Sequence, residues 1–310
     1  MPYLNFNSAK AASKLLIVIM SVLTIGIIVW FTGVLLGRLI FWMDLDEVNN
    51  VFYGKIELLS VEQLKYFQFI QTLGFFLLPG IFLHWIFSSE REYYFEVRPR
   101  LKIKSVILTV IVVLAALPLI NWILELNYAI KFPESINGIE NSLRGLEEKY
   151  ALITERLLTS ENIGHYIVNI IIIALFPAIG EELMFRGVFQ KLFYEINKNS
   201  HWAVLITALI FSLIHGQFFG IIPRFLLGIL LGYLMVWAQT IWLPVIAHFT
   251  NNALVVTLQY LAQRKIINGE DNFYTSIGDP TFVLIISALV VGTLVYLIRR
   301  NETYAINLEK

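Results

Sequence analysis

The stretch Gly180-Glu181-Glu182-Leu183-Met184-Phe185-Arg186 places three charged side chains at the end of a largely apolar run. That run, residues 163–179, otherwise has the composition of a membrane-spanning helix. Each charge would cost roughly 2.5–3.5 kcal/mol at the centre of a bilayer, and the three together on the order of 8–10 kcal/mol. Charges at such positions usually have a function, so the stretch predicts a functional site on a membrane helix. The alternative is a helix end whose charged side chains reach the membrane surface.

Helical spacing gives the two carboxylates different neighbours. Glu182 and Arg186 are four residues apart and share one helix face, with the acid before the base, which is the better order for an ion pair. Glu181 lies about 100° around the helix from Glu182. We therefore expect Arg186 to hold Glu182, while Glu181 faces elsewhere and is free for chemistry.

The composition of the whole chain is that of a membrane protein. Of its 310 residues, 57% are hydrophobic and 15% are charged, and the mean hydropathy is +0.70. The net charge is zero, so we expect no nucleic-acid partner. The absence of cysteine excludes thiol nucleophiles, disulfides and thiolate metal sites.

Hydropathy predicts an all-α, polytopic membrane helix bundle with about eight transmembrane helices in one membrane domain, residues 1–310. The expected spans are 15–41, 67–87, 106–126, 163–196, 201–217, 218–238, 242–262 and 281–298. The first is too long for the core of a signal peptide, so we interpret it as a retained span. Within the domain we distinguish N-terminal spans (1–126), an outer loop (127–162), a catalytic core (163–263), and a last span with its tail (264–310).

Basic residues indicate the orientation of the spans. They cluster before the first span, between the second and third, after the fourth and after the last: Lys10, Lys14, Arg91, Arg98, Arg100, Lys102, Lys104, Lys191, Lys198, Arg299, Arg300 and Lys310. With eight crossings all these clusters fall on one side, which the positive-inside rule identifies as cytoplasmic. Arg264 and Lys265 fall on the other side, against this trend. We expect an integral protein of a bacterial plasma membrane with both termini cytoplasmic.

The outer loop contains an amphipathic pattern. Apolar residues recur there at spacings of three and four, with charged residues between them: Ile136, Ile139, Leu143, Leu146, Tyr150, Ile153 and Leu157. This near-heptad pattern predicts one amphipathic extramembrane helix over 136–157. Such a helix either lies on the membrane surface, caps the site, or pairs with a copy of itself in a homo-oligomer.

Further polar side chains lie on the later spans. Phe211 and His215 are four residues apart, so an aromatic ring should pack beside the imidazole. His248 and Asn252 also share a helix face, where lipid offers neither of them a partner. Either pair would also suit hydrogen bonds between helices. Counting residues from the turn between the fourth and fifth spans places Glu181 and His215 within about 5 Å of the same depth. The sequence therefore permits these groups to meet.

One carboxylate, two imidazoles and one amide in an apolar bundle suit the activation of a water molecule. In one arrangement, Glu181 and His215 act together as the general base. His248 and Asn252 then donate hydrogen bonds to the developing oxyanion. In another arrangement, Glu181, His215 and His248 hold a zinc ion that lowers the pKa of the water.

Three short motifs stand in order, each on an expected span: Glu181-Glu182-xxx-Arg186, Phe211-xxx-His215 and His248-xxx-Asn252. Together they resemble the three ordered motifs of the CPBP family, the CAAX-type and bacteriocin-processing intramembrane proteases, also called the Abi family. The resemblance covers roughly residues 163–263. The other spans and the outer loop resemble nothing that indicates a function.

The resemblance implies an eight-helix endopeptidase that acts on a membrane-associated or lipidated protein or peptide. It implies that Glu181 activates the water with His215 as its partner. It also implies that His248 and Asn252 are the oxyanion or metal pair. The supporting residues would be Glu182, Arg186 and Phe211. The family is usually labelled metalloprotease, and a metal-free glutamate mechanism is also proposed for its prenyl-protein members, so the cofactor is either zinc or none.

Two other functions stay open from the sequence. One is a non-catalytic membrane scaffold or bacteriocin-immunity factor that binds a peptide through the helix over 136–157. The other is a transporter that uses buried Glu and His side chains as a proton relay. The lack of a clear inverted repeat counts against the transporter.

Overall fold

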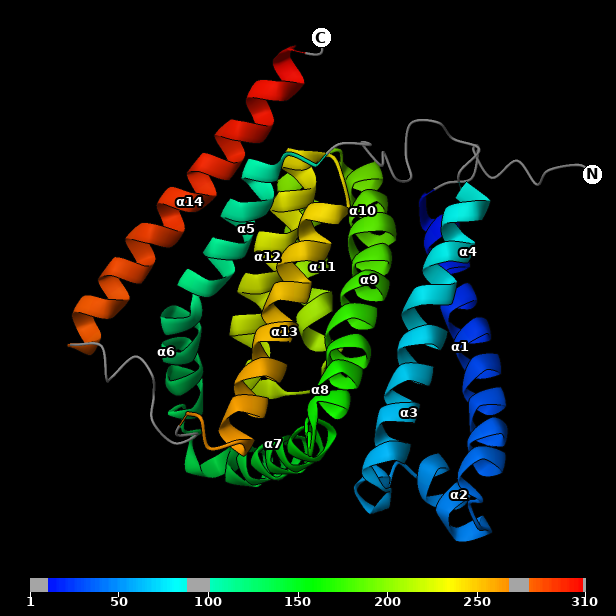
Figure 1. The fold of residues 1–310 in the computed structure, drawn as a ribbon. Helices are drawn as coiled ribbons and strands as arrows, with labels where there is room; N and C mark the ends of the chain where they lie inside the picture. The colour runs from blue at the N-terminus through cyan, green and yellow to red at the C-terminus, as the bar shows by residue number, and fades with distance from the viewer. Residues whose placement is uncertain (1–10, 88–100, 268–278, 309–310) are drawn as a thin grey trace, which may run out of the picture.

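The computed structural model describes residues 11–87, 101–267 and 279–308, and every regular element in these ranges is a helix. The helices form a bundle, with α7 lying across one end (Figure 1). The first residues of α1 and the last residues of α14 lie at the opposite end. The all-α membrane bundle predicted from the sequence is confirmed.

The N-terminal part is a pair of long helices. Here α1 (Ala11–Phe41) packs along a continuous helix made of α3, η3 and α4. Capping boxes begin α2 and α3. At α2, Asp44 and Glu47 exchange side-chain-to-backbone hydrogen bonds. Ser60 and Gln63 do the same at α3. The bounds are α2 Leu45–Phe52, η2 Ile56–Leu58, α3 Val61–Thr72, the π-helical η3 Leu73–Leu77, and α4 Leu78–Phe87.

The next two helices, α5 (Ile103–Ala115) and α6 (Leu117–Tyr128), form one span that is interrupted at Ala116. Pro118 lies in the first turn of α6 and has no N–H to continue the hydrogen-bond ladder of α5. On the other side of the bundle, α5 packs against α14 (Pro280–Leu308) and α13 (Trp242–Gln263).

A single long helix, residues 163–197, runs through the middle of the fold. Two of its segments, η5 and η6, are π-helical, and η6 begins directly after Glu182. Such wide turns occur frequently at functional sites. The bounds are α8 Ile163–Asn169, η5 Ile170–Leu175, α9 Phe176–Glu182, η6 Leu183–Phe189 and α10 Gln190–Asn197.

Three more helices pack on this central helix: α11 (Ser200–Leu213), α12 (Ile221–Ala238) and α13. Asn199 starts α11 by accepting hydrogen bonds from the backbone N–H groups of His201 and Trp202. A short 3-10 turn, η7 (Phe218–Gly220), leads from α11 into α12.

Six of the described helices are long and apolar enough to cross a membrane: Ser13–Phe41, Val61–Phe87, Ile103–Tyr128, Ile163–Asn197, Phe218–Ala238 and Pro280–Glu302. They agree with six of the eight expected spans. The span expected over 201–217 is the 14-residue α11, which is short for a crossing. The span expected over 242–262 forms as α13, but polar residues such as His248 and Asn252 lower its hydropathy, and it is not among the six. The count of eight is therefore not confirmed.

The amphipathic helix expected over 136–157 is α7 (Asn137–Leu157), which follows the 3-10 turn η4 (Glu134–Ile136). Its Ile153 and Leu157 pack against a buried cluster formed by α1, α2 and α3. Ile139 and Leu146, on the same apolar stripe, are exposed. The helix thus joins the N-terminal pair to the rest of the bundle, and pairing with a second copy stays a prediction.

The outer surface of the bundle is apolar. Leu39 on α1 is 71% exposed and Leu289 on α14 is 66% exposed, along with many other large hydrophobic side chains. Lipid tails are the natural solvent for such a surface. The protein is therefore an integral membrane protein, whereas its bacterial origin and cytoplasmic termini stay predictions. Some of the basic residues behind the orientation lie outside the described residues: Lys10, Arg91, Arg98, Arg100 and Lys310.

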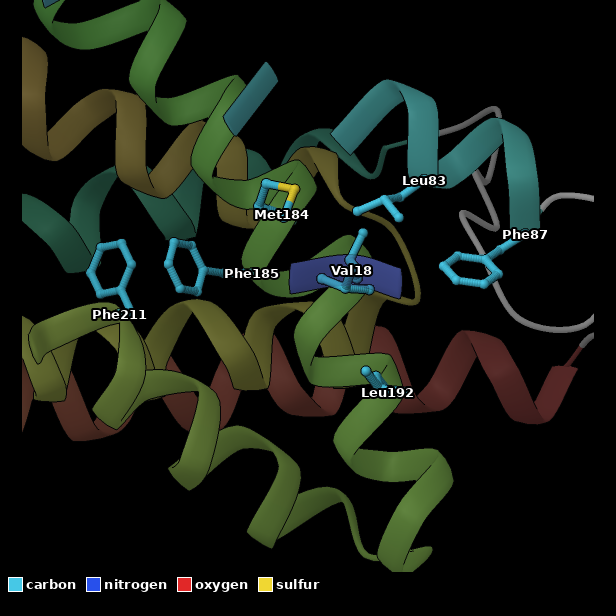
Figure 2. Packing of buried hydrophobic residues seen from close by; sticks show 8 residues of the cluster. Val18, Leu83, Phe87, Met184, Phe185, Leu192 and Phe211 are labelled. Atoms are coloured by element: carbon cyan, nitrogen blue, oxygen red, sulfur yellow. The ribbon is translucent and has the colours of Figure 1, made fainter. Parts of the chain in front are cut away.

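A buried apolar cluster lies next to the stretch with the three charges. Figure 2 shows Val18 of α1 and Leu83 of α4 beside Met184, and Phe185 beside Phe211 of α11. The Phe185 and Phe211 rings meet edge to face, with centroids 5.2 Å apart. This cluster fixes the π-helical segment after Glu182 against the helix that leads to His215.

Candidate active site

Glu182 and Arg186 form an ion pair that is completely buried. Nη1 of Arg186 lies 2.8 Å from Oε1 of Glu182, and its Nη2 donates to the carbonyl of Gly228 on α12 at 2.9 Å. The guanidinium carbon lies 5.0 Å from the centre of the Phe211 ring, a cation–π contact. The ion pair predicted from the spacing is confirmed, and it connects the central helix to α11 and α12.

His248 on α13 lies between the two glutamates. Its Nδ1 is 2.8 Å from Oε1 of Glu182, and its Nε2 is 3.9 Å from Oε2 of Glu181. The first distance is that of a hydrogen bond, and an ionised carboxylate only accepts, so Nδ1 carries the hydrogen. The second distance is too long for a direct hydrogen bond. Glu182 therefore orients the imidazole, whose Nε2 faces Glu181.

Glu181 keeps one carboxylate oxygen free. Its side chain is 13% exposed, yet Oε2 is buried and has no hydrogen-bond partner among the described residues. A buried carboxylate oxygen without a donor is costly and calls for a water or a ligand. Arg186 thus pairs with Glu182 and not with Glu181, as the helical spacing predicts, and the Oε2 of Glu181 can accept a hydrogen bond.

His215 lies two residues after Leu213, the last residue of α11. Its Nδ1 lies 2.7 Å from the carbonyl oxygen of Phe211, which only accepts, so Nδ1 carries the hydrogen and a neutral His215 has an accepting Nε2. The next residue, Gly216, has a φ of +67°, which glycine adopts without strain. Its N–H donates to the carbonyl of Leu213 and closes the helix. The end of α11 therefore fixes the position of His215.

The ring of Phe211 is a common packing surface for the site. It contacts His215 edge to face at 5.0 Å between centroids, as predicted. It also meets the His248 ring edge to face at 5.7 Å. Because the guanidinium of Arg186 lies over the same ring, Phe211 brings together groups from η6, α13 and the end of α11.

Asn252 lies one helical turn beyond His248 on α13 and is half-buried. Its Oδ1 accepts a hydrogen bond from Nδ2 of Asn251 at 3.1 Å. Asn251 lies about 100° around the helix from Asn252, so this bond joins two neighbouring faces of α13. Direct contacts thus gather Glu182, Arg186 and His248, with Glu181 next to them, while His215 joins through Phe211 and Asn252 through its place on α13.

The sequence patterns did not single out Arg224 on α12. The Nη2 of its guanidinium donates to Oε1 of Gln217, two residues after His215. Its charge also acts on Glu181 and on His215. An arginine inside an expected span carries the same cost as the charges in the opening stretch, and this signal could have found it.

The side chains considered as zinc ligands do not form a ligand group. In the described part of the chain, no three His, Asp or Glu side chains lie close enough together to hold a metal ion. A catalytic zinc needs three protein ligands at about 2.0–2.2 Å around one point. Glu181, His215 and His248 do not provide this geometry, so we assign no step to a metal.

The fold and this buried cluster define a polytopic helical membrane protein with an acid–imidazole site shared by three of its helices. Residues 163–254 match the family described as type II CAAX prenyl endopeptidase Rce1-like. All three motifs lie within the matched residues. The resemblance inferred from them is therefore confirmed for this segment, which is similar to the CAAX prenyl endopeptidases of the CPBP family.

One relative is the protein named "Putative membrane peptidase YdiL" of Bacillus subtilis (strain 168), which is 30% identical over 90 residues. The similarity covers 29% of this chain and 36% of the relative. The chain thus matches about a third of the length of that relative. No solved structure matches the chain significantly.

Proposed function

We propose that this chain is an intramembrane endopeptidase that hydrolyses a peptide bond of a membrane-associated or lipidated protein or peptide. The observation that carries the proposal is the position of His248, which is hydrogen-bonded to Glu182 and faces the free carboxylate oxygen of Glu181. The family match over residues 163–254 supports it. The reaction needs a bound water, a base and a donor to the oxyanion, and the cluster supplies the last two.

Charge balance suggests where the protons lie before reaction. Glu181 and Glu182 carry two negative charges when ionised, and Arg186 carries one positive charge. An uncompensated buried charge is costly, so one proton shared between Glu181 and His248 makes this group neutral. With that proton on Nε2, His248 is an imidazolium between two carboxylates and Glu181 is ready to act as a base.

In this form Glu181 takes a proton from a water while the water oxygen bonds to the scissile carbonyl carbon. Nε2 of His215 accepts the other hydrogen of the water and orients it. The carbonyl oxygen gains negative charge, and the Nε2–H of His248 and the amide of Asn252 donate to it. When the C–N bond breaks, the proton held by Glu181 passes to the leaving nitrogen. The products are a carboxylic acid and an amine.

Glu182 and Arg186 position the catalytic residues without touching the substrate. Glu182 holds His248 in one tautomer and one orientation, which is the role of the acid in a catalytic triad. Arg186 compensates the charge of Glu182 and ties it to α12. This assignment extends the role expected for the pair, since Glu182 contacts the imidazole directly.

The test is cleavage of a peptide library, with and without lipid groups, by the purified protein in liposomes. We expect Glu181→Gln and His248→Gln to lower the rate by about 10²-fold or more, the usual contribution of a general base or an oxyanion donor. Glu148→Gln is the matched control, because Glu148 is exposed on α7. Full activity in either site variant would rule out this mechanism.

A non-catalytic scaffold or immunity factor is the second candidate. The exposed Ile139 and Leu146 on α7 favour it, since they offer an apolar surface to a peptide, or to a second copy of this chain in a homo-oligomer. This function would survive Glu181→Gln and would be lost when both residues are changed to Ser. Endopeptidase activity would instead be lost in Glu181→Gln and would survive the two changes on α7.

A further inference from the structure

Arg224 is a partly buried cation with an unpartnered donor beside the candidate active site. Its Nη1 is buried and has no hydrogen-bond partner among the described residues. Among the described residues, the guanidinium donates one hydrogen bond, from Nη2 to the neutral amide of Gln217. No carboxylate of the described chain lies within ion-pair distance of the guanidinium. A guanidinium held in this way has a directed N–H available for a bound anion.

The neighbouring acid does not fill this position. Glu147 on α7 accepts from the hydroxyl of Tyr128 and from Nε2 of Gln217, both at 3.3 Å. The amide of Gln217 thus stands between the two charges, with its oxygen on Arg224 and its nitrogen on Glu147. Glu147 offsets the charge of Arg224 at a distance and leaves its Nη1 without an acceptor.

The backbone makes room for the guanidinium. A Cβ atom at Gly220 would lie 2.1 Å from Nη1 and 2.8 Å from Cζ of Arg224. Any other residue at this position would therefore displace the side chain. Gly220 also precedes the first turn of α12, and the positive end of a helix dipole favours negative charge. The chain keeps a cation at a helix end that attracts anions, which suits a ligand with a negative charge.

The geometry points to Arg224 as a specificity residue that binds a carboxylate of the substrate. This inference rests on the proposed endopeptidase function. The planar fork of an arginine matches the two oxygens of a carboxylate, and such charge-assisted bonds are among the strongest in proteins. Gln217 lies two residues from His215, so a carboxylate on Arg224 would hold the substrate with a peptide bond near Glu181 and His215. The carboxylate is either the C-terminus of the substrate or an acidic side chain next to the cleaved bond.

The experiment compares peptides that differ in one carboxylate. Each cleaved peptide is made with a free or an amidated C-terminus, and with Asp or Asn beside the cleaved bond, and kcat/KM is measured in liposomes. We expect the protein to prefer the carboxylate form by about tenfold or more, the value of one charged hydrogen bond. The pair that shows the preference identifies the source of the carboxylate.

Arg224→Gln should bring this ratio close to one, and Arg224→Lys, which keeps the charge and loses the fork, should give an intermediate ratio. Arg38→Gln is the matched control, because Arg38 is exposed at the end of α1, and it should keep the full ratio. A ratio that is the same in Arg224→Gln and in the unchanged protein overturns the inference. So does the absence of any preference for a carboxylate.

A binding measurement separates this inference from the proposed function. The same fluorescent peptides are titrated onto Glu181→Gln and onto Glu181→Gln/Arg224→Gln in liposomes. A carboxylate preference that depends on Arg224 without any cleavage by the unchanged protein would support the binding site and contradict the endopeptidase. Cleavage with no effect of Arg224 on either ratio would contradict only the binding site.

Discussion

Replacing Arg186 with Met should be among the most destabilising single changes in this protein. The substitution keeps an unbranched side chain and removes the charge and both hydrogen bonds. The Glu182 carboxylate would stay fully buried, and His248 would be its remaining hydrogen-bond partner. The carbonyl of Gly228 would lose the donor that now lies at 2.9 Å.

The expected magnitude follows from these lost contacts. Removing one partner of a buried ion pair typically costs about 3–5 kcal/mol, because the other charge stays buried without compensation. The lost hydrogen bond to the Gly228 carbonyl adds about 1 kcal/mol. We therefore expect Arg186→Met to lower the free energy of unfolding by about 4 kcal/mol or more, most of it from the charge of Glu182.

The assay is unfolding in mixed micelles, followed by the fluorescence of the seven tryptophans of the chain. The control is Glu182→Gln/Arg186→Met, in which no charge of the pair is left behind. Because the cost comes mainly from the stranded carboxylate, the double variant should be more stable than Arg186→Met by about 2 kcal/mol. The reasoning is wrong if the loss of unfolding free energy in the double variant equals the sum of the losses in Glu182→Gln and Arg186→Met. It is also wrong if Arg186→Met alone lowers the free energy of unfolding by less than about 1 kcal/mol.

Three further predictions concern the site and α7. Glu181→Gln should lower kcat by about 10²–10⁴-fold and leave the unfolding midpoint nearly unchanged, because the Oε2 of Glu181 has no partner to lose. Treatment with a zinc chelator should leave peptide cleavage unchanged, since the candidate ligands do not gather; a loss that added zinc restores would refute this. The third concerns acid. The backbone N–H of Phe132 and the guanidinium of Arg144 hold the pKa of Glu140 below its usual value. The stability that Glu140 contributes is therefore complete above its usual pKa and is lost as the pH falls through the lowered one. The hydrogen-exchange protection of the Phe132 amide should fall in that acid range, and Glu140→Gln should remove this pH dependence.

Local periodicity explains why most helices could be predicted. The helix expected over 136–157 is found at Asn137–Leu157, and the span expected over 218–238 matches η7 and α12. Both depend only on which residues share a helix face or fill an apolar window. The count of eight spans is not confirmed, because hydropathy is also a matter of local composition. Polar residues such as His248 and Asn252 lower the hydropathy of α13, so composition alone does not identify it as a span.

The candidate site was predictable only as far as its contacts are local. The pairs Glu182–Arg186 and Phe211–His215 are each four residues apart on one helix, and both contacts are present. The bond between His248 and Glu182 joins residues 66 positions apart on different helices. The spacing of residues around Glu181 and Glu182, or around His248, does not show which of the two glutamates the His248 ring will contact.

In this bundle the stability of the fold and the reactivity of the site depend on the same charges. Glu182 and Arg186 are fully buried, so the charge of this carboxylate must be compensated by side chains that approach it from defined directions. Arg186 compensates Glu182, and the proton on His248 is left for Glu181. If Arg186 is lost, that proton is drawn towards Glu182, and Glu181 faces an imidazole with an altered charge. Arg186→Met should therefore reduce cleavage even where the protein stays folded, whereas a truncation elsewhere in the core, such as Leu231→Ala, should reduce stability alone.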